Sequence, residues 1–156
     1  MKRIAFSLLV LLLSGAPGQA GRSSYDDRAK ELQKERDRLD KEKDPVTRAK
    51  IEIRISDLLL ENVADSVRDG KFSEMQEGLA AYTSAIEDAH ETLVASGRNA
   101  QKNSGGFKEL EIAIRKQVLK FDDYARMLTT DRREPIEQAR KLVSGIRNKL
   151  LKALFP

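Results

Sequence analysis

The sequence predicts an all-α fold, an antiparallel helical bundle of two long helical hairpins preceded by a charged N-terminal helix. Apolar residues recur at spacings of three and four over most of the chain, which is the periodicity of a helix with one buried face. Alternation with a period of two, which is typical of half-buried strands, is almost absent. Only 4 prolines and 9 glycines occur in 156 residues, so we expect long helices joined by few turns.

Residues 1–20 have the three zones of a secretory signal peptide. Two basic residues precede an apolar run over 4–13, and Gly18 and Ala20 place small side chains before a predicted cleavage point after Ala20. As a helix the apolar run is about 15 Å long, half of the roughly 30 Å hydrocarbon core, so no stable membrane insertion is expected after cleavage. We therefore expect an exported protein, periplasmic or extracellular, with a single helical domain over 21–156.

The charge and the cysteine content limit the possible functions. The chain has 29 basic and 25 acidic residues, and removal of the signal takes away two basic residues, leaving 27 against 25 and a net charge of +2. So small an excess on a heavily charged chain predicts no nucleic-acid partner. Cysteine is absent, so packing alone must stabilise the fold. Tryptophan is also absent, which disfavours carbohydrate platforms and dense recognition patches.

The charged segment, residues 21–44, is expected to form a helix from Ser24 to Lys43 with Ser24 as its N-cap. Its apolar residues fall only once per heptad, which is too narrow a stripe for a core helix. We therefore expect a loosely docked or solvated helix that is held by ion pairs between side chains four residues apart. The residues concerned are the heptad-spaced Tyr25, Leu32 and Leu39 and the ion pair Asp37 and Lys41.

Residues 45–96 are predicted to form the first hairpin. Asp44 before Pro45 suits an N-cap and first helical position, and Gly70 suits a left-handed C-cap. The helix after Pro45 has two apolar stripes and should be the most buried, and the helix after Gly70 has one continuous stripe facing it. The stripes are Val46, Ala49, Ile53, Ser56, Leu60, Val63 and Val67; Ile51, Ile55 and Leu58; and Phe72, Met75, Leu79, Tyr82, Ile86, Ala89 and Leu93.

Residues 97–106 (GRNAQKNSGG) are predicted to be a loop that leads into a second hairpin over 107–156. Asp131 with Glu134 predicts a capping box at the start of the last helix, with Pro135 in its first turn. One core shared by both hairpins would make a four-helix bundle. The stripes are Phe107, Leu110, Ile114, Gln117, Phe121, Tyr124 and Leu128, and then Ile136, Ala139, Val143, Ile146, Leu150 and Ala153.

The strongest local pattern for chemistry is Glu87 to His90, a Glu-x-x-His on a helix beside Asp88 and Glu91. Di-iron bundles use this motif on two helices, and the chain has only one histidine, so the ligand set cannot close. A haem held by His90 and either Met75 or Met127 has no better support, because Met75 lies about four turns away and core methionines are ordinary. We therefore expect no catalytic, cofactor-binding or metal-binding residues and no cofactor.

The C-terminal helix contains no acidic residue after Glu137 but five basic ones. A cationic end of this kind could contact anionic lipids or an acidic partner. We favour a structural interpretation, because basic side chains at a helix C-terminus complement its dipole and cover apolar surface. Membrane binding would also need the charges on one face, whereas these are spread around the helix. The five are Arg140, Lys141, Arg147, Lys149 and Lys152.

Two stretches resemble known families. The segment Arg48 to Leu93 contains RAKIEIRISDLL, DGKFSEM and AAYTSAIEDA, and it resembles the helical-hairpin domains of uncharacterised secreted bacterial proteins and a single tetratricopeptide-type hairpin. This resemblance implies a helix-turn-helix and no ligand. Residues 128–130 (LTT), with Arg132 at the glutamine position, resemble the LTxxQ motif of periplasmic helical stress chaperones, which implies binding of unfolded clients.

Apolar stripes without reactive residues predict a non-enzymatic exported protein that acts through protein–protein contacts, as a self-associating or adaptor module. The alternative is a small periplasmic helical chaperone or stress-response protein, in which the charged first helix gates a client-binding face. A third hypothesis is a ligand-binding or metal-dependent enzyme built in the bundle core, and the missing ligands argue against it.

Overall fold

The computed structural model describes residues 19–156, so the greater part of the predicted signal peptide, residues 1–18, lies outside the described residues. The described chain is helical, without strands, and the all-α prediction is confirmed. Its helices are α1 (Gln19–Lys41), α2 (Pro45–Arg68), α3 (Phe72–Ala95), α4 (Phe107–Met127), the short 3-10 helix η1 (Thr130–Arg132) and α5 (Glu134–Leu154).

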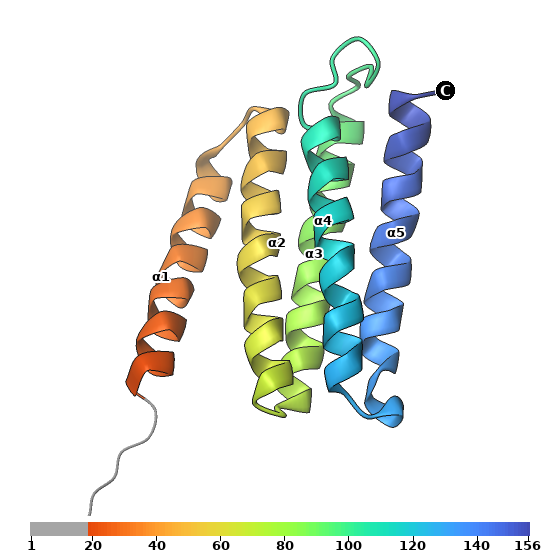
Figure 1. Ribbon diagram of the computed structural model, residues 1–156. Coiled ribbons are helices and arrows are strands. Elements are labelled where there is room, and N and C mark those ends of the chain that lie inside the picture. Colours follow the sequence, from red (N-terminus) through yellow and green to blue (C-terminus); the bar gives the residue numbers. More distant parts are fainter. Residues whose placement is uncertain (1–18) are drawn as a thin grey trace, which may run out of the picture.

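Helices α2 to α5 form a four-helix bundle, and α1 lies outside it against α2 (Figure 1). Helices α2 and α3 make one antiparallel hairpin, and α4 and α5 make the other, as the sequence predicts. The hairpins meet with α2 beside α4 and α3 beside α5, and each of these pairs runs parallel. The chain must therefore cross between hairpins after α3, which explains why the connection over 96–106 is much longer than the turn over 69–71.

The predicted apolar stripes meet in one core. Helix α2 has 11 buried residues, more than any other helix, as its two stripes predict. All the stripe positions predicted for α2 to α5 are buried or half-buried except Ala153, which is exposed. That prediction was wrong because Leu154 takes the last core position: a step of four from Leu150 continues the stripe as well as a step of three and buries a larger side chain.

Helix α2 begins and ends as its sequence predicts. The Asp44 carboxylate accepts the backbone N–H of Thr47 at 2.8 Å, which caps the helix, and Pro45 occupies its first position. At the other end, Gly70 has a φ of 69°, and the Lys71 N–H donates to the Ser66 carbonyl at 2.9 Å. This is a Schellman arrangement, and it reverses the chain into α3.

Three predicted details of helix termini are wrong. Ser24 lies inside α1, which already begins at Gln19 because no residue between them stops a helix. The helix also ends at Lys41, before the predicted Lys43, where the Glu42 carboxylate accepts backbone N–H groups and turns the chain. The capping box from Asp131 does not form, because Asp131 lies within η1 and Glu134 is the first residue of α5.

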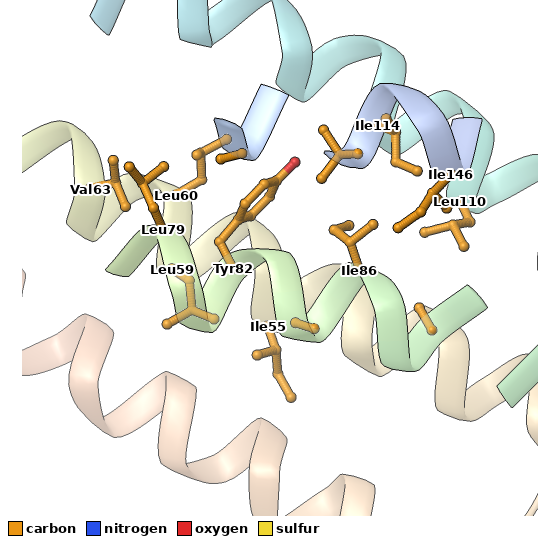
Figure 2. Packing of buried hydrophobic residues seen from close by; sticks show 14 of the residues in the cluster. Ile55, Leu59, Leu60, Val63, Leu79, Tyr82, Ile86, Leu110, Ile114 and Ile146 are labelled. Atoms are coloured by element: carbon orange, nitrogen blue, oxygen red, sulfur yellow. The ribbon is translucent and has the colours of Figure 1, made fainter. Parts of the chain in front are cut away.

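A buried hydrogen-bond network joins three helices inside the apolar core. The Tyr82 hydroxyl of α3 points toward α4 (Figure 2) and donates to Gln117 Oε1 at 3.0 Å. The Gln117 amide in turn donates to Ser56 Oγ at 2.9 Å and to Asp57 Oδ1 at 2.8 Å, both on α2. The ring of Phe121 packs edge-on against Tyr82, with ring centres 5.6 Å apart. These bonds fix the position of α4 relative to both helices of the first hairpin.

We predict that Tyr82→Phe lowers the free energy of unfolding by about 1 to 2 kcal/mol, because the Gln117 carbonyl loses its donor in a buried site. Urea denaturation followed by circular dichroism measures the difference. Tyr25→Phe is the control, since Tyr25 is exposed and its hydroxyl makes no such bond. Equal denaturation midpoints for the wild type and Tyr82→Phe would show that the network contributes nothing.

We further predict opposite effects of alanine at two glycines. Gly106 has a φ of 86°, and an added Cβ would collide with the Leu93 side chain, so Gly106→Ala should destabilise the protein by at least about 1 kcal/mol. Gly145 lies inside α5 with open space around its Cα, so Gly145→Ala should stabilise it by about 0.5 to 1 kcal/mol. Thermal unfolding of both variants checks the two signs, and a gain from Gly106→Ala would contradict the packing of the loop against α3.

Candidate functional site

The acidic and histidine residues of the Glu-x-x-His pattern do not form a metal centre in this structure. His90 is half-buried, while Glu87, Asp88 and Glu91 are exposed. Burial lowers the pKa of His90, and the nearby Lys149 of α5 lowers it further. Within the part of the chain that the structure describes, no three histidine or acidic side chains are grouped so that they could hold a metal ion.

The methionines considered as haem ligands lie in different environments. Met75 is fully buried in the core, whereas Met127 is exposed at the end of α4. Their positions give His90 no thioether partner, since Met75 is held within the apolar cluster near the opposite end of α3.

Two of the five basic residues of α5 connect the second hairpin. Arg140 bridges to Asp122 at 2.9 Å, and Arg147 donates to Glu111 at 2.8 Å, both on α4. Lys141, Lys149 and Lys152 are exposed. The basic set therefore divides into residues that hold α5 against α4 and residues on the outer surface.

Helix α1 docks on α2 mainly through charged side chains. Among the heptad-spaced residues only Leu32 is buried, while Leu39 is half-buried and Tyr25 is exposed. Arg28 pairs with Asp65 and Glu61 of α2, and Glu31 pairs with Arg54, so these five charged residues join the two helices beside Leu32. The predicted ion pair between Asp37 and Lys41 does not form within the described part of the chain. The Asp37 carboxylate accepts a hydrogen bond from the Gln33 side-chain amide instead. The Glu31–Arg54 pair is exposed and contributes about 0 to 1 kcal/mol, whereas the Arg28 side chain is largely buried beside Asp65.

A groove of about 240 Å³ lies between α1 and α3, with α2 as its floor. Ile55 and Leu59 of α2 point away from the bundle core toward α1 (Figure 2). Ala81 and Ala85 form the α3 wall, and their small side chains leave the space open. The complete lining, which we call the α1–α3 groove, is Arg36, Leu39, Glu52, Ile55, Leu59, Ala81, Ser84, Ala85 and Asp88.

Glu52 is the unusual member of the groove. Its side chain is only 3% exposed, and its Oε2 has no hydrogen-bond partner. Its Oε1 lies 4.0 Å from an Nη2 of Arg48, too far for a hydrogen bond. Burial raises the pKa of Glu52 to about 7, and the negative charge of Asp88 adds to the rise, while Arg48 and a hydrogen bond from the Thr92 side chain oppose it. A buried carboxylate with a free oxygen is costly unless a donor reaches it.

Helix α3, which forms one wall of the groove, is an acidic helix, and Asp88 is the acidic residue that it contributes to the lining. Between Phe72 and Ala95 the helix contains five acidic residues and neither lysine nor arginine. All five are exposed, so their charges face solvent and any approaching partner. A second hollow, about 310 Å³ between α3 and α5, is lined by uncharged residues alone. The α1–α3 groove is therefore the more distinctive candidate site, because it combines apolar lining with ionisable groups.

Sequence patterns missed Glu52. It lies between the two apolar stripes of α2, and its neighbours at three, four and seven residues further on are Ile55, Ser56 and Leu59. An acidic residue at helical spacing from several residues of a buried face is the signal that would have identified Glu52.

Comparison of the chain with protein-family models, curated proteins and solved structures found no match. None of the helices in residues 19–156 is both long and apolar enough to cross a membrane. The case for function therefore depends on the geometry of the groove.

We predict that Glu52→Gln changes how stability depends on pH. Because the folded state raises the pKa of Glu52 from 4.5 to about 7, ionisation of this residue opposes folding, and the loss of stability grows from pH 4.5 to above pH 7. The variant should match the wild type near pH 4 and exceed it at pH 8.5 by on the order of 1 to 3 kcal/mol.

Chemical denaturation at both pH values measures this difference. Glu87→Gln is the control, since Glu87 is exposed on the same helix as Asp88 but outside the groove lining. A Glu52→Gln variant that is less stable than the wild type at pH 8.5 would contradict the burial argument.

Proposed function

We propose that this chain is an exported, non-enzymatic helical protein that acts through contacts with another protein made at the α1–α3 groove. The observation that carries the proposal is the position of Ile55 and Leu59, two core-type side chains that face a groove rather than the bundle interior. Export rests on the pattern of residues 1–20.

The proposed partner is an amphipathic helix with basic residues on the edges of its apolar face. Two long helices with small residues on one wall form the kind of channel into which a third helix packs. The negative charge of helix α3, with Asp88 at the groove, complements basic side chains on the incoming helix. Ser84 adds a hydroxyl that can exchange hydrogen bonds at the rim.

The largely charged contact between α1 and α2 fits this role. The three residues 42–44 separate α1 from the bundle, and ion pairs rather than an apolar interface hold the helix in place. A small outward movement of α1 would widen the groove and would uncover Leu32 of α1 together with Ile55 and Leu59 of α2, which are 5% and 6% exposed while α1 is docked.

A chaperone is the second candidate function, and the same observation about α1 favours it. If α1 separates from α2, the side chains of Ile55, Leu59 and Ile51 become a longer apolar strip. Unfolded clients could then bind, and α1 would act as the gate.

We predict that a photoreactive residue at Ser84 in the full-length protein, expressed in its native host, cross-links to a basic amphipathic helix. The same residue at Lys120, exposed on α4, is the control and should capture little. Ala81→Arg in the groove wall should abolish capture at Ser84 while circular dichroism stays unchanged.

Mass spectrometry of the cross-linked peptide decides between the candidates. One basic helical segment supports the proposal, including α5 of a second copy, which has five basic residues. Many unrelated segments favour the chaperone, and equal capture at Lys120 and Ser84 would overturn a specific role for the groove.

A further inference from the structure

We infer that Glu52 is a cation-binding subsite of the α1–α3 groove, which accepts the ammonium or guanidinium group of a lysine or arginine whose aliphatic stem lies along the groove. The inference deepens the proposed function, and it rests on that function only for the claim that the cation belongs to a partner protein.

The free oxygen of Glu52 is the first argument. The carboxylate lies at the floor of the groove on α2. The residue is only 3% exposed, and Oε2 has no hydrogen-bond donor. A buried acceptor in this condition loses its hydration without gaining a bond. A donor that enters along the groove would supply the missing bond.

Arg48, the nearest cation, is not free to supply it. Its Nη1 donates to the backbone carbonyl of Leu39 in the last turn of α1 at 2.8 Å, and to that of Glu42, the residue after α1, at 2.9 Å. These bonds hold the guanidinium 4.0 Å from Glu52 Oε1. Arg48 therefore lowers the cost of the negative charge without satisfying the carboxylate.

The lining of the groove selects the rest of the ligand. Leu39, Ile55 and Leu59 present aliphatic surface beside Glu52, which suits a chain of methylene groups. Asp88 at the α3 wall gives a second acceptor, so a cation has two negative charges to approach. A carboxylate ligand would be repelled by both of these charges and would find an attractive charge in the lining only at Arg36, so the groove favours a cation.

Binding should depend on pH, because only ionised Glu52 attracts a cation. The charged groups that face it are Arg36 from α1, Arg48 from α2 itself and Asp88 from α3. Arg36 competes for the same carboxylates, so Arg36→Ala should not weaken binding. Because the pKa of Glu52 is about 7, the affinity should fall roughly tenfold between pH 8 and pH 5.8.

The test uses n-hexylammonium as the probe, titrated into the isotope-labelled protein at pH 8 and followed by nuclear magnetic resonance. We expect saturable shifts at the amides of Ile55, Ala81 and Ala85, with a dissociation constant on the order of millimolar. Glu52→Gln should weaken binding by roughly tenfold, whereas Glu87→Gln should leave it unchanged. The amide spectrum of each variant confirms that it is folded.

Two further probes, the uncharged n-hexanol and the anionic n-hexanoate, complete the experiment. If n-hexanol binds as tightly as n-hexylammonium, or if Glu52→Gln binds n-hexylammonium as well as the wild type, the groove is merely apolar and the inference fails. Binding of n-hexanoate would also overturn it. If n-hexylammonium does not bind but cross-linking at Ser84 is specific, the cation subsite is rejected and the proposed function stands. If n-hexylammonium binds but cross-linking at Ser84 is not specific, the subsite stands and the partner protein is rejected.

Discussion

The buried amide of Gln117 fixes how the two hairpins meet. It lies on α4, bonds to Ser56 and Asp57 on α2, and accepts the hydroxyl of Tyr82 from α3. Apolar side chains alone permit one helix pair to slide along another by a turn, whereas a slide here would leave several buried polar groups without partners. Since α5 follows α4 after a short connection, its position against α3 depends on the same contact.

The groove is a consequence of this arrangement together with the composition of α1. Helices α2 to α5 share the main core, and Ile55 and Leu59 of α2 are left on the side that faces α1. Helix α1 covers this side with one apolar residue per heptad, of which only Leu32 is buried. Charged pairs from Arg28 and Glu31 make further contacts with α2, and neither residue lines the groove above Ile55 and Leu59.

Local signals determine more of the fold than of the site. Spacing predicts every helix of the bundle, and Asp44 and Gly70 mark where α2 begins and ends because their side-chain and backbone chemistry acts over a few residues. The capping box expected at Asp131 does not form, because the 3-10 helix η1 takes its place. No sequence pattern shows which of these two structures will form. From the sequence alone, Glu52 is expected to be exposed to solvent. Its burial and its lack of a hydrogen-bond partner at Oε2 arise only when α1 and α3 pack around it, because both are properties of tertiary contacts.

Arg48 links the position of α1 to the state of the groove. The same guanidinium bonds the terminal carbonyls of α1 and lies beside Glu52, so a stronger pull from the carboxylate weakens its hold on α1. A cation from a partner neutralises Glu52 and leaves Arg48 to α1, which keeps that wall of the groove in place. An apolar helix without such a cation would leave the carboxylate unpaired and the wall less firmly held. Because coupling between two sites is reciprocal, firm docking of α1 would in turn favour the basic ligand that we propose, and the groove would then select helices by charge as well as by shape.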